Sequence, residues 1–395
     1  MNKKVLVFSH EFPPQQGGEG TYAYELASGL NKLNYNVYVL AGTTFSKNLN
    51  SVPIDSDLFK KNIKIERYDW VKKNRLWFIS WRKIFTRYIK NEGPFDYIFF
   101  ANFTSCVIGH RISNDILPPY SITIHGDDID YYFTNKKFKS RILIKKAGIK
   151  TFFENANKII CVSKFAKKNL IDVIPFSIDS EVIHHGIESR DITLIQHSAS
   201  EMIKLIRRDK KISKDKTILI YVSRLESMKG QDKLIDILCK KGELVKKTHT
   251  FFVGGGSQYQ SLKKLVDENN ISHQVTFTGE IPREEVMKYM SFADIVIFLS
   301  DHPKETFGLV ILEGMLMKKP VVVLNHGGMV EVVQHSKNGF IVNTDEIEST
   351  LSLLVNDKNL RERMGEEGRK LIDTKFNNEN MVLETISGQS ELCVE

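Results

Sequence analysis

Short apolar runs rich in β-branched and aromatic residues recur along the chain and alternate with stretches of helical patterning. These runs lie at 5–8, 36–40, 97–101, 121–125, 158–163, 218–223, 250–255, 275–279, 295–300 and 321–324. Strands that are apolar on both faces and alternate with helices are typical of parallel sheets covered on both sides. The sequence therefore predicts an α/β protein with two doubly wound, Rossmann-like domains.

The length of 395 residues agrees with two domains, because one domain usually takes 100–200 residues. A glycine and a polar stretch between two strands place the predicted boundary near 184–191. We expect an N-terminal domain at 1–190 and a C-terminal domain at 191–374. Residues 375–395 are expected to pack back on the first domain.

Polar or glycine-rich segments follow at least five of the predicted strands. In open α/β sheets, ligands bind beyond the carboxyl ends of the strands. We therefore expect the two domains to face each other across one cleft lined by these segments.

Charge is distributed unevenly. Residues 1–190 hold 28 Lys and Arg against 18 Asp and Glu, whereas residues 191–395 hold 28 against 30. Such asymmetry indicates an anionic partner, namely a membrane surface, a nucleic acid or a phosphorylated substrate. No nucleic-acid-binding motif occurs, so we expect no nucleic acid.

The sequence also predicts a cytoplasmic protein. Its apolar runs fall well short of the ~20 residues that span a bilayer, and the N-terminal run is too short for a signal peptide. The four cysteines are scattered without metal-ligand or disulfide spacing.

Two glycines, Gly17 and Gly18, follow the first strand and precede a helix predicted to begin near Thr21. A glycine pair lets backbone N–H groups approach an anion at a helix N-terminus. A tight strand-to-helix turn is the alternative interpretation. The pattern is not the dinucleotide-binding fingerprint, which argues against a nicotinamide enzyme.

Arg224 and Lys229 come directly after a strand and are closed by Gly230. A guanidinium fork and a point charge near each other suit a diphosphate. A solvated charged turn is the alternative.

The segment from Glu305 to Glu313 carries the sharpest pattern in the chain. Gly308 is predicted to open a helix, with Glu305 at its N-terminus and Glu313 inside it. The free amides there belong to Phe307, Gly308 and Leu309. A carboxylate beside free amides can accept hydrogen bonds from hydroxyls and donate them to anions, as a sugar phosphate requires.

Taken together, these motifs resemble the retaining glycosyltransferases of family 4, which have the GT-B fold. The E-x7-E signature matches Glu305 and Glu313, and the R-x4-K motif matches Arg224 and Lys229. Further similarities are the glycine loop at 17–18, the His-Gly turn at 125–126, and segments 182–188, 254–256 and 325–331.

The resemblance implies transfer of a hexose-type sugar from a UDP- or GDP-linked donor, with retention and without a bound metal or cofactor. The acceptor would be a glycan or a lipid-linked molecule in cell-envelope polysaccharide or glycolipid synthesis. Ser223, in place of a more usual glycine, and a longer loop at 301–304 depart from the family pattern and leave the sugar open.

The resemblance also assigns roles to residues. Arg224 and Lys229 would hold the diphosphate, Glu313 the ribose hydroxyls, and Glu305 with the amides behind it the transferred sugar. His125 would line the sugar and acceptor site. The implied catalytic residues are thus His125, Arg224, Lys229 and Glu305, and the implied donor-binding residues are Gly17, Gly18, Arg224, Lys229, Gly255, Glu305, Phe307, Gly308, Leu309 and Glu313.

Three other interpretations stay open. A nucleotide-sugar epimerase could share the fold, and a non-catalytic partner subunit could share the motifs. Asp128 and Asp130 form a D-x-D pattern that elsewhere binds metal, although a solvated acidic turn is the preferred interpretation.

All three tryptophans lie in one basic stretch. On a helical wheel, Trp77 and Trp81 share an apolar face, opposite basic residues that include Arg82, Lys83 and Arg87. Such a helix is typical of attachment to an anionic membrane surface. We therefore expect a peripheral protein on the inner face of the cytoplasmic membrane, the alternative being that the apolar face packs on the core.

Overall fold

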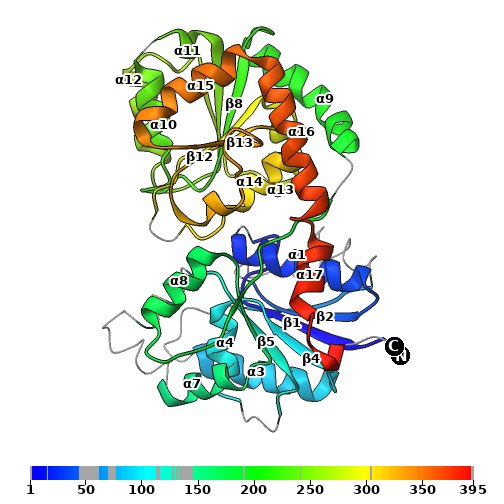
Figure 1. Cartoon of the computed structure of the whole chain (residues 1–395). Helices are drawn as coiled ribbons and strands as arrows, with labels where there is room; N and C mark the ends of the chain where they lie inside the picture. The colour runs from blue at the N-terminus through cyan, green and yellow to red at the C-terminus, as the bar shows by residue number, and fades with distance from the viewer. Residues whose placement is uncertain are drawn as a thin grey trace. The chain divides into compact units, whose positions relative to one another are not determined.

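The computed structural model describes residues 2–15, 17–43, 62–69, 77–112, 116–126, 129, 133, 146–189, 192–240, 242–302 and 305–392. The chain forms two compact units (Figure 1). Unit 1 comprises residues 1–188 and 377–395, and unit 2 comprises residues 189–376. The predicted boundaries at 190 and 374 each lie two residues from these.

Unit 1 is built on a seven-stranded parallel sheet of order β3-β2-β1-β4-β5-β6-β7. Its strands are β1 (Lys4–Ser9), β2 (Asn36–Thr43), β3 (Lys64–Asp69), β4 (Tyr97–Phe100), β5 (Tyr120–Ile124), β6 (Lys158–Cys161) and β7 (Glu181–Val182). Its helices include α1 (Gly18–Lys32), α3 (Trp77–Glu92), α4 (Phe103–Gly109), α7 (Lys146–Glu154), α8 (Lys164–Val173) and α17 (Asn378–Ile386). The strand order reverses between β1 and β4, as in a Rossmann-type sheet.

The C-terminal helix α17 belongs to the core of unit 1. It packs on α1, where Gly29 allows a close approach: an added Cβ would lie 2.7 Å from Cγ2 of Val382. Met381 and Val382 are buried in the same hydrophobic cluster as β1 and β2. The ammonium of Lys158 on β6 donates to the carbonyls of Glu384 and Ser387 at 3.0 and 2.9 Å, and so caps the end of α17.

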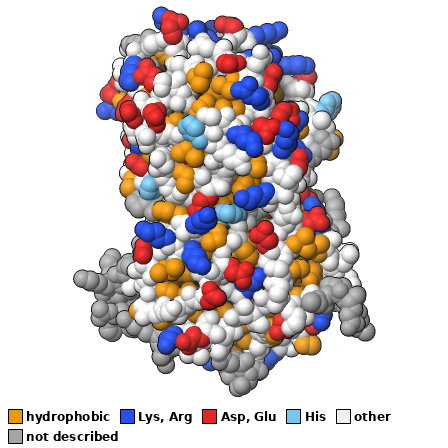
Figure 2. All heavy atoms as spheres, viewed as in Figure 1, with side chains coloured by type: hydrophobic (Ala, Val, Ile, Leu, Met, Phe, Trp, Pro, Cys, Tyr) orange, Lys and Arg blue, Asp and Glu red, His pale blue; other side chains and the backbone are white. Residues whose placement is uncertain are grey.

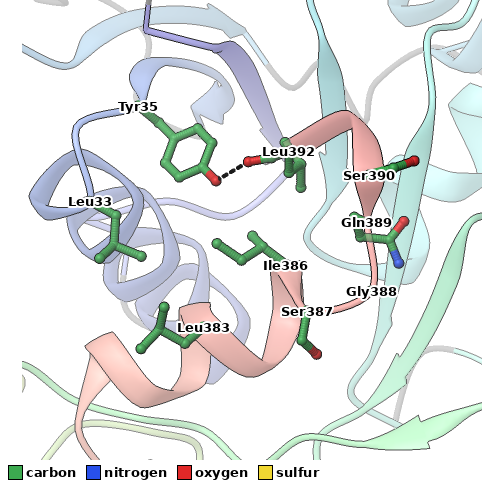
Figure 3. A pocket seen from close by; sticks show the side chains of 9 residues that line it. All are labelled: Leu33, Tyr35, Leu383, Ile386, Ser387, Gly388, Gln389, Ser390 and Leu392. Carbon is green, nitrogen blue, oxygen red and sulfur yellow. Dashed lines mark hydrogen bonds between the residues drawn. The ribbon is translucent and has the colours of Figure 1, made fainter. Parts of the chain in front are cut away.

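A cavity of about 570 Å³ lies between the end of α1 and the C-terminal segment (Figure 3). Apolar side chains such as Leu33 and Ile386 line it, and the hydroxyl of Tyr35 donates to the carbonyl of Leu392 at 2.6 Å. None of the predicted site residues is among its lining residues. The cavity therefore belongs to the packing of the C-terminal segment.

The predicted membrane role of Trp81 is wrong. Its side chain is 1% exposed, and its ring packs against Phe8 of β1 and Tyr68 of β3. Phe85, on the same helix face, stacks on Phe8 at 4.5 Å between ring centroids. Trp81 and Phe85 are buried because they cover the sheet, which leaves both side chains unable to enter a bilayer.

The basic side of α3 is solvated, with Arg82, Lys83 and Arg87 exposed. The side chain of Trp77 lies outside the described residues. In the view of Figure 2, basic and acidic side chains are interspersed over the surface of both units. Within the described part of the chain, no helix is both long and apolar enough to cross a membrane.

Unit 2 has a six-stranded parallel sheet of order β10-β9-β8-β11-β12-β13. Its strands are β8 (Thr217–Val222), β9 (Thr248–Val253), β10 (Val275–Gly279), β11 (Ile295–Phe298), β12 (Val321–Leu324) and β13 (Gly339–Val342). Its helices are α9 (Ile192–Asp209), α10 (Gln231–Cys239), α11 (Glu243–Lys247), α12 (Tyr259–Glu268), α13 (Arg283–Phe292), α14 (Leu309–Leu316), α15 (Ile347–Asn356) and α16 (Lys358–Thr374). The order reverses between β8 and β11, so the two units share one architecture and the predicted fold is confirmed.

Candidate active site

The clearest cluster of predicted site residues lies at the carboxyl edge of the unit 2 sheet. Arg224 and Lys229 follow β8, the glycine turn 254–256 follows β9, and Glu305 follows β11. Because parallel strands end at one edge, these separate segments come together there. The closest contact joins Nζ of Lys229 to Oε2 of Glu305 at 2.6 Å.

The Lys229–Glu305 pair is largely shielded from water. The two side chains are 15% and 13% exposed. The hydroxyl of the buried Ser300 also lies within hydrogen-bond distance of Glu305, 3.1 Å from Oε2. The carboxylate of Glu305 is thus held by a cation and a hydroxyl, which fixes its place beside the ammonium.

The loop that carries Lys229 is fixed to the sheet by Tyr221. The Tyr221 hydroxyl accepts a hydrogen bond from the backbone of Leu299 at 2.7 Å and donates to the carbonyl of Lys229. Burial raises the pKa of Tyr221 well above its usual value, so the hydroxyl keeps the proton it donates. Gly230 closes the loop with φ 80°, where an added Cβ would collide with the Leu299 carbonyl.

The glycine turn after β9 supports the backbone around Arg224. An added Cβ on Gly254 would collide with the Ser223 carbonyl, and the backbone N–H of Leu225 donates to the Gly255 carbonyl at 2.8 Å. The Arg224 side chain itself is exposed. The turn therefore holds the chain in place while the guanidinium stays available to a ligand.

Gly308 begins α14, as predicted, and does so as an N-cap in the left-handed conformation. Glu305 precedes the helix on its loop, and the backbone of Gly328 donates to the Glu305 carbonyl at 3.0 Å. This contact explains why a segment near 325–331 accompanies the acidic motif.

Glu313 lies inside α14 and is 7% exposed. Its Oε1 accepts a hydrogen bond from Nε of Arg283 at 3.1 Å, and Nη2 of the same residue lies 3.0 Å away. Arg283 is the first residue of α13 and lies four positions after the last residue of β10. The second glutamate of the motif is therefore buried and paired with an arginine.

In unit 1, the glycine pair stands beside a carboxylate of the same loop. α1 begins at Gly18, three residues earlier than predicted, with Gly17 as its N-cap. The backbone N–H of Gly20 donates to Oε2 of Glu11 at 3.4 Å, and an added Cβ on Gly17 would collide with this carboxylate. The amides predicted to meet a ligand anion thus have an internal anion nearby.

His125 follows β5 and is 6% exposed. Its Nε2 donates to the carbonyl of Ala101 at 2.9 Å, so Nδ1 is the nitrogen that can accept a hydrogen bond. The rings of Tyr22 and His185 pack against it. Burial lowers the pKa of His125 to about 4, so the imidazole is neutral near pH 7 and suited to accept a hydroxyl proton in a hydrogen bond.

Comparisons with known proteins identify the family and the fold. Residues 16–190 match the family described as Glycosyltransferase Family 4, and residues 202–371 match Glycosyl transferases group 1. The chain belongs to glycosyltransferase family 4. An uncharacterized glycosyltransferase of Methanocaldococcus jannaschii is 28% identical over 82% of this chain and 83% of its own length.

One further relative of this family-4 glycosyltransferase and one structural neighbour have names that state what those proteins bind. A GDP-mannose-dependent alpha-(1-6)-phosphatidylinositol monomannoside mannosyltransferase of Mycobacterium tuberculosis is 23% identical over 64% of each chain. The structure of HepE from Anabaena in complex with UDP-glucose superposes with a TM-score of 0.71, at 21% identity, over 97% of this chain and 99% of its own. The latter supports the GT-B fold of this enzyme.

The sequence did not predict four residues that contact the predicted site residues in this family-4 glycosyltransferase. They are Glu11, Tyr221, Arg283 and Ser300. Arg283 carried the best available signal, because it follows a predicted strand as the other site residues do. Asp128 and Asp130 lie outside the described residues. Over the ranges that the structure covers, no group of three or more His, Cys, Asp or Glu side chains forms a metal site.

Proposed function

We propose that this glycosyltransferase transfers a hexose from a UDP- or GDP-linked donor to a hydroxyl of a glycan or lipid-linked acceptor, with retention. The observation that carries the proposal is the contact between Lys229 and Glu305 at the carboxyl edge of the unit 2 sheet. A cation and a carboxylate in contact match a diphosphate that is joined to a polyhydroxylated sugar. The UDP-glucose bound to HepE and the GDP-mannose dependence of the mycobacterial relative support this donor class.

In the proposed reaction, Lys229 turns from Glu305 to the diphosphate, and the exposed Arg224 provides a second positive charge. Positive charge stabilises the departing diphosphate without a bound metal or cofactor. Glu305 then accepts hydrogen bonds from sugar hydroxyls, and the amides of Phe307, Gly308 and Leu309 face the same ligand.

We propose retention without a carboxylate nucleophile, because both glutamates of the motif are already engaged. Glu305 is held by Lys229 and Ser300, and Glu313 by Arg283, which makes both poor nucleophiles. We propose that the acceptor hydroxyl attacks the anomeric carbon from the face that the diphosphate leaves. The bond to the phosphate oxygen breaks, and that oxygen takes the acceptor proton. His125, Gly17 and Gly18 in unit 1 are proposed to line the sugar and acceptor region.

A panel of UDP-, GDP- and ADP-hexoses tests the donor. A ligand at 100 times its Kd stabilises the protein by about 2.7 kcal/mol, which a thermal-shift assay detects. The product of the stabilising donor should be an α-glycoside by NMR, and activity should survive EDTA. A β-linked product, or activity lost in EDTA and restored by manganese, would contradict the proposal.

We also propose, on narrower grounds than the sequence indicated, that the enzyme works at an anionic membrane surface. The supporting observation is the exposed basic side of α3 alone. Trp81 and Phe85 on the opposite side are buried and provide no membrane contact. Wild-type protein should sediment with anionic vesicles at low salt, and replacing Arg82, Lys83 and Arg87 by Ser should reduce this. No sedimentation at low salt would favour a soluble acceptor.

A further inference from the structure

We propose that Arg283 positions the carboxylate of Glu313 to receive the ribose hydroxyls of the donor nucleotide. This inference rests on the proposed nucleotide-sugar site and adds to it a residue outside the motifs of the sequence. Arg283 is the first residue of α13 and reaches Glu313 on α14, thirty residues further along the chain.

The geometry of the pair favours one carboxylate oxygen. The hydrogen bond from Nε, at 3.1 Å, and the contact with Nη2, at 3.0 Å, both reach Oε1. A planar guanidinium that holds one oxygen from two nitrogens restricts the rotation of the carboxylate. Oε2 is the oxygen that this arrangement keeps for a ligand.

Burial makes the pairing necessary for ribose binding. The Glu313 side chain is 10% exposed, and a buried carboxylate without a cation is strongly disfavoured. If Arg283 were removed, nothing would hold the carboxylate of Glu313 in its buried position. It would then lose the orientation that charge-assisted hydrogen bonds from the ribose hydroxyls require.

The position of Arg283 agrees with a role in binding and not in packing alone. Its side chain is 31% exposed, so it is accessible to solvent while it holds Glu313. It lies in the segment after β10, at the sheet edge where Arg224, Lys229 and Glu305 follow their own strands.

The test uses isothermal titration calorimetry on the full-length protein. Titrations with UDP and GDP first show which nucleoside diphosphate binds. The 2′,3′-dideoxy form of that nucleotide, which lacks both ribose hydroxyls, is then titrated for comparison. Wild-type protein should bind the ribose form at least about ten-fold more tightly. In Arg283→Gln the ratio should fall to about two-fold, while the affinity for the dideoxy form changes little.

Two further variants show whether Arg283 acts through Glu313. In a Glu313→Gln background, Arg283→Gln should add less than about two-fold to the loss of affinity, because the two residues form one unit. Arg283→Lys retains the charge but not the fork, so its ratio should be intermediate. It also provides a folded protein if Arg283→Gln does not fold.

The matched control is Arg208→Lys, on the exposed surface of the same unit. It should leave both affinities unchanged. If the ratio of the two affinities in Arg283→Gln stays at the wild-type value, the positioning role is wrong. If wild-type protein binds neither UDP nor GDP, the proposed function itself fails, and this inference fails with it.

Discussion

The ammonium nitrogen of Lys229 lies 2.6 Å from Oε2 of Glu305, although the two residues are 76 positions apart in the sequence. Each is proposed to bind a different part of the donor, Lys229 the diphosphate and Glu305 the sugar. In this structure the two residues are bonded to each other. Each would have to release the other before it could bind its part of the donor. Donor binding exchanges one ion pair for two ligand contacts.

Glu305→Gln should separate affinity from turnover. A neutral amide competes less well for Lys229, so nucleoside diphosphate should bind several-fold more tightly, by calorimetry. Turnover should fall by roughly 10²-fold, because the amide stabilises the sugar poorly in the transition state. Nucleotide affinity that falls in Glu305→Gln would show that the carboxylate does not compete with the ligand.

Lys229→Ala should weaken nucleotide binding and lower kcat by about 10²–10³-fold, since one cation on the departing diphosphate is lost. Lys240→Ala is the matched control: this lysine on the same unit also pairs with a glutamate, but its side chain is 60% exposed. Removing such a surface pair should change the stability by less than about 1 kcal/mol and leave kcat unaltered. Wild-type turnover in Lys229→Ala would show that the active site has been misplaced.

The buried His125 should make the protein less stable in acid. Its pKa is about 4 in the folded protein and near 6.5 when unfolded, so between these values the unfolded chain binds more protons. Stability should fall as the pH drops from 6.5 to 4, by up to about 3 kcal/mol from this residue. His125→Asn should flatten the pH dependence of the unfolding temperature, and His197→Asn, at an exposed position on α9, should not. An equal slope in wild type and His125→Asn would be inconsistent with a neutral, buried imidazole.

Lys158→Met should loosen the C-terminal helix. The substitution keeps the aliphatic stem but removes the ammonium that caps α17, at a cost of about 1.5–3 kcal/mol in the free energy of unfolding. Urea denaturation measures this cost, and limited proteolysis should cut first in the C-terminal segment. Lys168→Met, on α8 with a side chain that is 75% exposed, serves as control. Equal stability of the two variants would mean that the cap contributes little.

The sequence predicted the fold because both sheets are assembled from local signals, namely buried β-branched runs with helices between them. It also predicted that Gly308 opens a helix behind Glu305, since a glycine before an apolar helical stretch is a short-range feature. It could not predict the side-chain contacts between segments that follow different strands of the sheet. Neither the Lys229–Glu305 pair nor the Arg283–Glu313 pair follows from local spacing.

Trp81 illustrates a different limit. A helical wheel shows which face of α3 is apolar, but a face that covers a sheet and a face that enters a membrane have the same pattern. Phe8, which packs against Trp81 in the structure, is more than seventy residues away in the sequence. Only the three-dimensional fold decides between the two interpretations.

The return of the C-terminal segment to unit 1 has a consequence for biosynthesis. The ribosome completes every strand of unit 2 before it adds Met381, Val382 and Leu392, which fill the core of unit 1. The first half to leave the exit tunnel is therefore the last to finish folding, and until then its α1 surface is open to chaperones. A chain truncated after residue 376 should therefore contain a folded unit 2 and an N-terminal unit that still lacks part of its core.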